Sequence, residues 1–190
     1  MKSNRALIFS LILIVLFASI YRVIPSRPFG FAPQLAIALF AGAVIKDRKW
    51  AFSLPIFSLF LSDLLYQLLF DKGQTDIWGF YEGQWQNYLL FAGLVAIGFF
   101  IKKINVVNVL AGSLAAPIVY FLTSNFLVWA GWQGTRGYNR PKTWDGLLMC
   151  YADGLPFFPW TVVSTVLFSA LLFGGYYLVG QFSVKPALTR

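Results

Sequence analysis

The stretch VVNVLAGSLAAPIVYFLTSNFLVWAG, residues 106–131, contains no charged side chain. A helix needs about 20 predominantly apolar residues to cross the hydrocarbon core of a bilayer. Pro117 lies inside the run, which transmembrane helices tolerate when neighbouring helices satisfy the freed backbone groups. The stretch therefore predicts a transmembrane helix over residues 106–131.

Similar apolar runs fill most of the chain on both sides of this one. The whole sequence is 58% hydrophobic and only 12% charged, whereas an ordinary soluble domain has about 25% charged residues. Lipid must therefore solvate much of the surface. The predicted fold class is all-α, a polytopic membrane helical bundle of about six transmembrane helices in a single domain over residues 1–190. The expected spans are approximately residues 6–21, 33–45, 50–70, 85–101, 106–131 and 157–181.

The first run could instead be a signal peptide. We favour a retained first helix, because Arg22 follows the run at once and no convincing small-residue cleavage site is present. The second helix, residues 33–45, is too short to cross a core of about 30 Å at 1.5 Å per residue. Pro25, Pro28 and Pro33 make the connection before it stiff and irregular. Irregular backbone at membrane depth must be covered by protein or line a cavity, so we expect this connection to dip over a cavity.

Charge and reactive side chains exclude several classes of protein. The formal charge is +8, but the cations sit in short clusters between apolar runs, so they are interpreted as topology signals and not as a nucleic-acid surface. Histidine is absent and Cys150 is the single cysteine, which excludes a Cys/His zinc cluster and a histidine base. We expect no enzyme, no metal and no cofactor. Cys150 is either a soft metal ligand or an inert small side chain, and we favour the second.

The cations are unequally divided between the two sides of the predicted bundle. One side holds nine, namely Lys2, Arg5, Lys46, Arg48, Lys49, Lys102, Lys103, Lys185 and Arg190. The other side holds six, namely Arg22, Arg27, Lys72, Arg136, Arg140 and Lys142. Cytoplasmic loops carry the excess of Lys and Arg, so both termini are expected in the cytoplasm and the long aromatic-rich loops outside.

Asp63 is the most informative candidate for function. It lies thirteen positions after Trp50, about 20 Å along the third helix. A carboxylate at that depth is expensive unless it faces a cavity or a partner. It is either a solute-contacting or ion-coupling acid or half of a structural pair, for which Arg22 at the end of the first helix is the candidate partner.

The fifth predicted helix carries a second set of polar candidates. Tyr120, Ser124 and Asn125 lie close to one helix face, and the Asn125 amide suits an amide-like ligand edge. They could equally act as interhelical hydrogen-bonding groups. The aromatic residues near the outer loops form either an interfacial belt or a stacking wall for a ring-bearing ligand. The remaining candidate solute contacts are Arg22, the Gln34-Leu35 pair, Trp129, Tyr151 and Asp153.

Several motifs in order along the chain carry a family resemblance. They are Arg22-x-x-Pro25, Phe31-Ala32-Pro33-x-x-Ala36-x-Ala38-Leu39-Phe40-Ala41-Gly42-Ala43, Leu54-Pro55, Leu61-Ser62-Asp63-Leu64, Ser124-Asn125-Phe126-x-Val128-Trp129, Gly146-Leu147-x-x-Cys150-Tyr151 and Leu155-Pro156-Phe157-Phe158. Together they resemble an uncharacterised family of bacterial inner-membrane proteins that is similar to the substrate-binding S components of energy-coupling-factor vitamin transporters. The chain departs from that family at Gly30, where the family usually has asparagine.

The resemblance implies a six-helix bundle with an outward-facing pocket, closed over a small vitamin by the connection between helices one and two and by the outer loops. The first function hypothesis is accordingly a membrane subunit that binds a vitamin-like solute for uptake. No Walker A loop is present, so energy would come from a partner or a gradient. The second hypothesis is a non-transporting accessory or scaffold subunit of a larger inner-membrane complex. The expected partners are the lipid bilayer, a membrane protein subunit and a small molecule.

Overall fold

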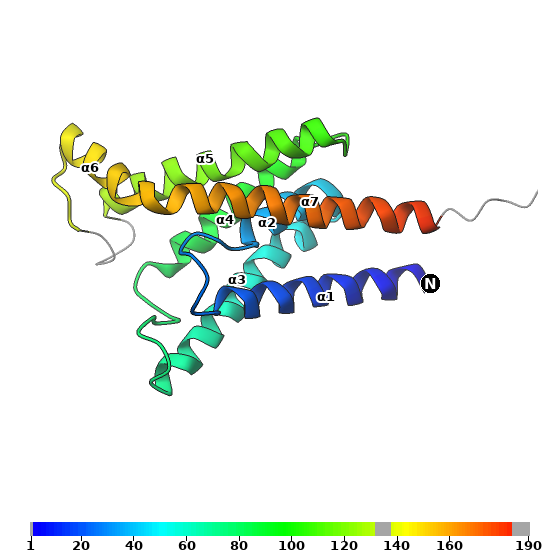
Figure 1. The fold of residues 1–190 in the computed structure, drawn as a ribbon, viewed down its shortest axis with the longest axis horizontal. Coiled ribbons are helices and arrows are strands. Elements are labelled where there is room, and N and C mark those ends of the chain that lie inside the picture. The colour runs from blue at the N-terminus through cyan, green and yellow to red at the C-terminus, as the bar shows by residue number, and fades with distance from the viewer. Residues whose placement is uncertain (1, 132–137, 184–190) are drawn as a thin grey trace, which may run out of the picture.

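The computed structural model describes residues 2–131 and 138–183, and every element in these ranges is helical. The elements are α1 (Lys2–Arg22), α2 (Gln34–Val44), α3 (Arg48–Asp71), α4 (Gln84–Phe99), α5 (Val106–Ala130), α6 (Trp144–Gly154), the 3-10 turn η1 (Leu155–Phe157) and α7 (Phe158–Ser183). Figure 1 shows the long helices running roughly along the length of the molecule. The all-α prediction is confirmed, and the expected spans agree with the observed helices to within a few residues at most ends.

Three helical segments of the described chain are long and apolar enough to cross a membrane. They are α3, α5 and the continuous segment Trp144–Leu178 that contains α6, η1 and most of α7. The described apolar part of α1 (Ile12–Arg22) and all of α2 are shorter. Large apolar side chains such as Ile118, Leu122 and Phe126 are exposed on the outer surface of α5, as lipid solvation requires. The molecule is therefore a helical membrane bundle, and the total of about six spans stays a prediction.

The short helix α2 occupies the centre of the bundle. Every residue from Gln34 to Gly42 is buried, and α3, α4, α5 and α7 all pack against the helix. Gly42 makes this possible where α2 crosses α4, because a Cβ atom there would overlap the carbonyl oxygen of Val95 and come within 2.9 Å of the Gly98 Cα. Small residues thus allow the close approach of α2 and α4 at this contact.

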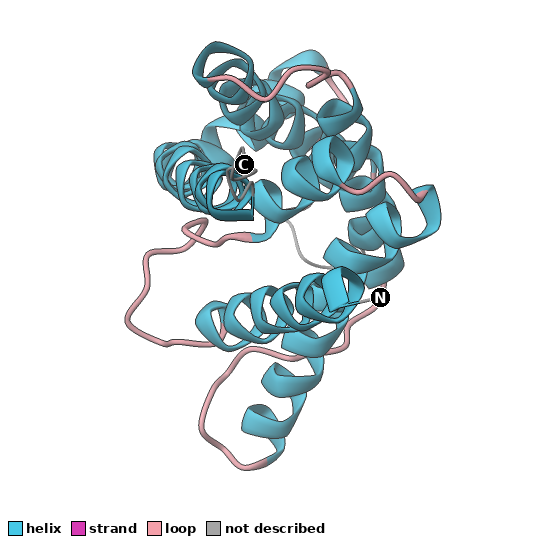
Figure 2. Ribbon diagram, turned by 90° about the vertical axis from the view of Figure 1, so that its right-hand side faces the viewer, coloured by secondary structure: helices cyan, strands magenta, loops and turns pink. Residues whose placement is uncertain are grey.

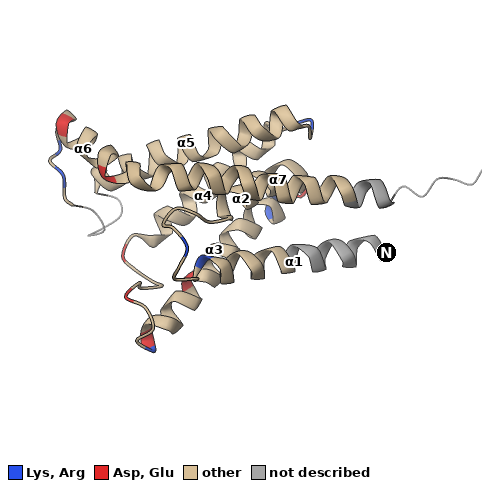
Figure 3. Ribbon diagram, viewed as in Figure 1, with Lys and Arg blue, Asp and Glu red and all other residues tan. Residues whose placement is uncertain are grey.

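The connections alternate between the two ends of the bundle. The α1–α2 connection, the α3–α4 loop and α6 lie at one end, and the start of α1 with the α2–α3 and α4–α5 turns lies at the other (Figure 1). Figure 2 views the molecule from the end at which α1 begins. Acidic residues gather at the loop-rich end (Figure 3). This confirms the predicted grouping of the described charges by side. Arg136, Lys185 and Arg190 lie outside the described residues, as do the side chains of Lys2 and Arg5. The orientation relative to the cytoplasm stays a prediction.

The short helix α6 begins directly after Thr143. Thr143 is its N-cap, and its Oγ1 accepts a hydrogen bond of 3.2 Å from the backbone N–H of Gly146, which satisfies one of the free donors of the first turn. Cys150 is buried, and its Sγ donates to the carbonyl oxygen of Asn125 at 3.3 Å. Within the described ranges no group of three or more His, Cys, Asp or Glu could hold a metal. Through its contact with Asn125, Cys150 packs α6 onto α5.

Candidate functional site

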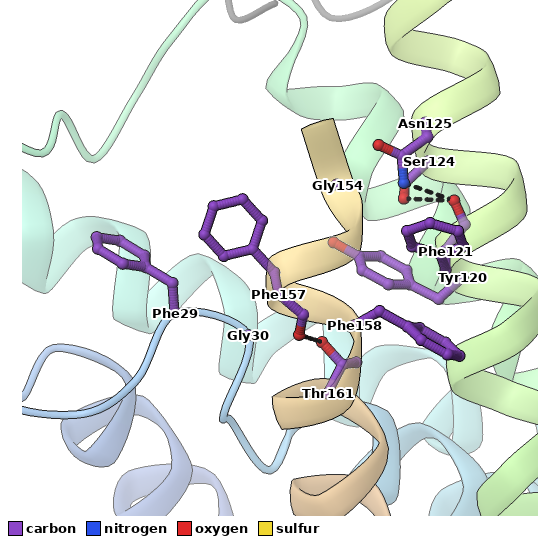
Figure 4. A pocket seen from close by; sticks show the side chains of 10 residues that line it. All are labelled: Phe29, Gly30, Tyr120, Phe121, Ser124, Asn125, Gly154, Phe157, Phe158 and Thr161. Carbon is purple, nitrogen blue, oxygen red and sulfur yellow. Dashed lines mark hydrogen bonds between the residues drawn. The ribbon is translucent and has the colours of Figure 1, made fainter. Parts of the chain in front are cut away.

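A cavity of about 380 Å³ opens between α5, α6, η1, α7 and the α1–α2 connection. This volume lies in the range of pockets that hold small molecules. Its location confirms the expectation that the connection before Pro33 covers a cavity. The residues that line it, drawn in Figure 4, are Phe29, Gly30, Tyr120, Phe121, Ser124, Asn125, Gly154, Phe157, Phe158 and Thr161.

Aromatic rings make up much of the lining. In the view of Figure 4 the rings of Phe29 and Phe157 lie on one side, with Tyr120 and Phe121 from α5 on the other. The rings support one another: the centroids of Phe121 and Phe158 are 4.8 Å apart, and those of Phe29 and Phe157 are 6.2 Å apart in an edge-to-face arrangement. Such walls suit a flat apolar ring, which packs well against aromatic faces and edges.

The polar groups of the cavity come from side-chain amides and hydroxyls, several of which are engaged with backbone carbonyl oxygens. The Asn125 Nδ2 donates to the carbonyl oxygen of Phe121 at 2.8 Å, and the Thr161 Oγ1 donates to that of Phe157 at 3.0 Å. Ser124 makes a longer contact of 3.4 Å with the same Phe121 oxygen. The Asn125 Oδ1, the second N–H of the Asn125 Nδ2 and the hydroxyl lone pairs remain for polar groups of a ligand. None of the lining residues, all in the described part of the chain, is charged.

Two glycines allow the elements around the cavity to approach closely. Gly30 has φ = +86°, and a Cβ atom there would come within 2.6 Å of the Phe157 carbonyl oxygen and 2.8 Å of the Thr161 Oγ1. A Cβ on Gly154 would overlap the side-chain amide of Asn125. Glycine at position 30 thus fits both the left-handed backbone and the contact of the α1–α2 connection with η1 and α7.

Asp63 does not line this cavity. It is only 4% exposed, and one carboxylate oxygen accepts a hydrogen bond from the Arg22 guanidinium in a salt bridge. The other oxygen accepts from the Gln84 Nε2 at 2.6 Å and from the Tyr88 hydroxyl at 2.8 Å. Arg22 also donates to the Ser62 Oγ at 2.6 Å. The structure thus contains the second of the two alternatives for Asp63, the structural pair with Arg22. The hydrogen bonds of this pair join α1, α3 and α4.

The same network continues into the α1–α2 connection. The carbonyl oxygen of Arg22 accepts hydrogen bonds from the Arg27 Nε at 2.7 Å and the Tyr66 hydroxyl at 2.6 Å. Arg27 also donates to the Tyr66 oxygen at 3.1 Å and to the Phe31 carbonyl oxygen at 3.3 Å. The segment that carries Phe29 and Gly30 is therefore fixed to α1 and α3 by the buried ion pair and its neighbours.

Three other sequence candidates hold α5, α6 and the residues before α6 together. The Trp129 Nε1 donates to the Pro141 carbonyl oxygen at 2.8 Å, and the Tyr151 hydroxyl donates to the Leu122 carbonyl oxygen at 3.1 Å. Asp153 forms a two-contact salt bridge with Arg140, at 2.7 and 2.8 Å. This pairing raises the pKa of Arg140 above its ordinary value, mainly through the side-chain hydrogen bond. Asp153 is the neighbour of the lining residue Gly154, so it lies close to the cavity without lining it.

The Gln34-Leu35 pair is internal to the bundle. The Gln34 Nε2 donates to the Ala18 carbonyl oxygen at 3.2 Å, and Leu35 belongs to the hydrophobic core. Of the predicted solute contacts, the structure thus brings only Tyr120 and Asn125 to the cavity. The expectation that Tyr120, Ser124 and Asn125 share one face is confirmed, because all three line it.

Sequence reasoning did not select Phe29, Phe121, Phe157, Phe158 and Thr161 as site residues. Each is an ordinary apolar or small residue in its own segment, and only the packing of three distant segments brings them together. The sequence signals that pointed toward them were the Pro-rich connection around Phe29 and the Leu155-Pro156-Phe157-Phe158 motif.

Comparison with known proteins supports a family assignment but no function. No curated protein and no solved structure matches the chain. The model of one family, described as a family of unknown function (DUF6580), matches residues 2–188, which is nearly the whole chain. The chain therefore belongs to this family of unknown function, DUF6580.

Proposed function

We propose that this protein is a membrane-embedded component that binds a small, uncharged, ring-bearing solute for uptake. The observation that carries the proposal is the 380 Å³ cavity lined by aromatic rings and by acceptors from α5 and α7. Pockets that are mainly apolar with a few placed polar groups are typical of small-molecule sites.

The absence of charged side chains from the described lining argues that the solute is uncharged. Moving a charged group out of water without a partner is very unfavourable, and the cavity offers no side chain of opposite charge. A ligand with a flat ring and one or two N–H or O–H donors would instead stack on Phe121 or Phe157 and donate to Asn125. Vitamin-like heterocycles have this chemistry.

The sequence resemblance to S components of vitamin transporters points in the same direction. In those proteins a pocket at the outer side is covered by the connection between the first two helices, and here Phe29 and Gly30 from the equivalent connection line the cavity. The balance of nine cations to six would place this end outside the cytoplasm, with both termini inside a bacterial inner membrane. Transport would then rely on a partner subunit or an ion gradient.

Replacing Asn125 with leucine should reduce solute retention about tenfold or more. The change keeps the size of the side chain but removes the acceptor, and a site built to pair with a ligand N–H or O–H discriminates strongly when that group has no partner. The measurement is native mass spectrometry of the detergent-purified protein, which compares the small molecule retained by wild type and variant.

The matched control is Asn87→Leu on α4, since Asn87 does not line the cavity. Both variants should show similar melting temperatures, and only Asn125→Leu should lose the ligand. Equal retention by the two variants, or wild-type protein that carries no small molecule when freshly isolated, would remove the support for a solute site here.

A scaffold role is the second candidate, and one observation favours it. Asp63 is enclosed by Arg22, Gln84 and Tyr88, so the most polar group within the membrane helices stabilises the bundle and does not face the cavity. For a scaffold subunit, copurification should recover a stable membrane-protein partner and no small molecule.

A further inference from the structure

A second, smaller cavity lies at the opposite end of the bundle, beside the turn between α2 and α3. Its volume is about 170 Å³, and residues 42–45, Lys46, Arg48 and Phe99 line it. Unlike the aromatic cavity at the other end, this one contains two cations. It lies where the α2–α3 turn meets the end of α4.

The cations here are not neutralised by the described protein. Lys46 lies in this turn, Arg48 and Lys49 begin α3, and Lys102 and Lys103 lie in the turn that follows Phe99. The one carboxylate in the two turns, Asp47, caps α3 by accepting a hydrogen bond of 2.9 Å from the Lys49 backbone N–H. The salt bridges of the described residues involve other cations. The corner thus has five cations against one carboxylate.

Arg48 is held in a defined position. Its guanidinium carbon lies 3.6 Å from the centroid of the Phe99 ring, a stacked cation–π arrangement. A stacked guanidinium keeps its N–H groups in one plane, with an edge free for two parallel hydrogen bonds to phosphate oxygens. Lys46, which lines the same cavity, adds a flexible positive charge.

An apolar track begins two residues after Arg48. Exposed side chains follow one another at intervals of three or four residues along the helix α3, with Ser53 as the one polar exposed member near the start. The apolar members are Trp50 at 65% exposure, Phe57 at 57%, Phe60 at 43%, Leu64 at 38% and Leu68 at 49%. Residues at this spacing share one helix face, so an acyl chain could lie along α3 from the basic turn into the bilayer.

We propose that this corner binds an anionic phospholipid, with its phosphate at Lys46 and Arg48 and its acyl chains along α3. Basic pockets between transmembrane helices bind anionic headgroups in this manner. The alternative explanation is that these cations only set the orientation of the chain in the membrane, which depends on their number. That role does not need a cavity beside the cations, a stacked arginine or an adjoining apolar track. The inference is independent of the solute proposed for the other cavity.

The test is native mass spectrometry of the full-length protein with equal amounts of phosphatidylglycerol and phosphatidylcholine. Wild type should retain phosphatidylglycerol preferentially, and Lys46→Gln/Arg48→Gln should lower that preference roughly tenfold, since each cation near an anionic membrane surface contributes substantially. The control Lys72→Gln/Lys142→Gln removes the same charge at the other end and should keep the preference. Arg48→Lys should lose less of this lipid preference than the double variant does.

Two results would overturn the assignment. One is an unchanged lipid preference in Lys46→Gln/Arg48→Gln, with a melting temperature like that of the control. The other is complete displacement of phosphatidylglycerol by excess glycerol phosphate, which would make a free phosphate compound and not a lipid the ligand.

Discussion

Asp63→Ala is expected to lower the free energy of unfolding by about 3–5 kcal/mol, the usual effect of removing one partner from a buried ion pair. The variant leaves Arg22, whose side chain is only 20% exposed, without its carboxylate. It also removes the acceptor that Gln84 and Tyr88 share. The measurement is thermal or denaturant unfolding of the detergent-purified protein.

A double variant and a surface control complete this test. Asp63→Leu/Arg22→Met replaces the pair with apolar side chains of similar size and should recover part of the loss, because no unpaired charge remains. The donors of Gln84 and Tyr88 still lack their acceptor in this variant. Asp71→Ala removes an exposed carboxylate of the same helix, whose contact is a hydrogen bond of 2.8 Å from Gln67, and should change stability little. A melting temperature for Asp63→Ala equal to that of Asp71→Ala would contradict the structural role of the network.

Gly42→Ala is expected to destabilise the bundle by about 1–3 kcal/mol through overpacking. The added methyl group would meet the backbone of α4 at Val95 and Gly98, and backbone atoms cannot move aside as the end of a long side chain can. Since α2 is surrounded by other helices, a shift at this crossing must be transmitted to its other contacts. A thermal melt of the purified variant measures the effect.

The matched control is Gly93→Ala on α4. A Cβ atom at Gly93 would meet nothing within 4 Å, so this substitution should be neutral or slightly stabilising, because alanine is the better helix former by about 1 kcal/mol. If Gly42→Ala and Gly93→Ala have equal melting temperatures, the α2–α4 crossing is looser than the structure indicates.

The helices and their ends were readable from the sequence because each is a local property. The uncharged stretch over residues 106–131 became α5, and the short run over residues 33–45 became α2, which begins after Pro33. The sequence did not identify α4 as the helix that meets Gly42. The grouping of charges by end followed from counting turns between helices.

The site was predictable only in part. Tyr120, Ser124 and Asn125 share a face by helical periodicity alone, so their joint position in the cavity could be anticipated. The sequence left two interpretations of Asp63 open, because a carboxylate within a membrane helix requires either a cavity or a cation. A linear sequence does not give the distances between helices that would decide between them. The structure contains the pair, with Arg22 and Asp63 forty-one residues apart.

The sequence by itself determined that this chain folds as helices in lipid, since apolar content, helix length and caps act within single segments. Only the tertiary structure decided which polar groups are satisfied and where a cavity remains. The aromatic walls come from the α1–α2 connection, α5 and the start of α7, and their meeting depends on how α2 packs against its neighbours. That packing is fixed by side-chain volumes summed over several helices, which no single stretch of residues contains.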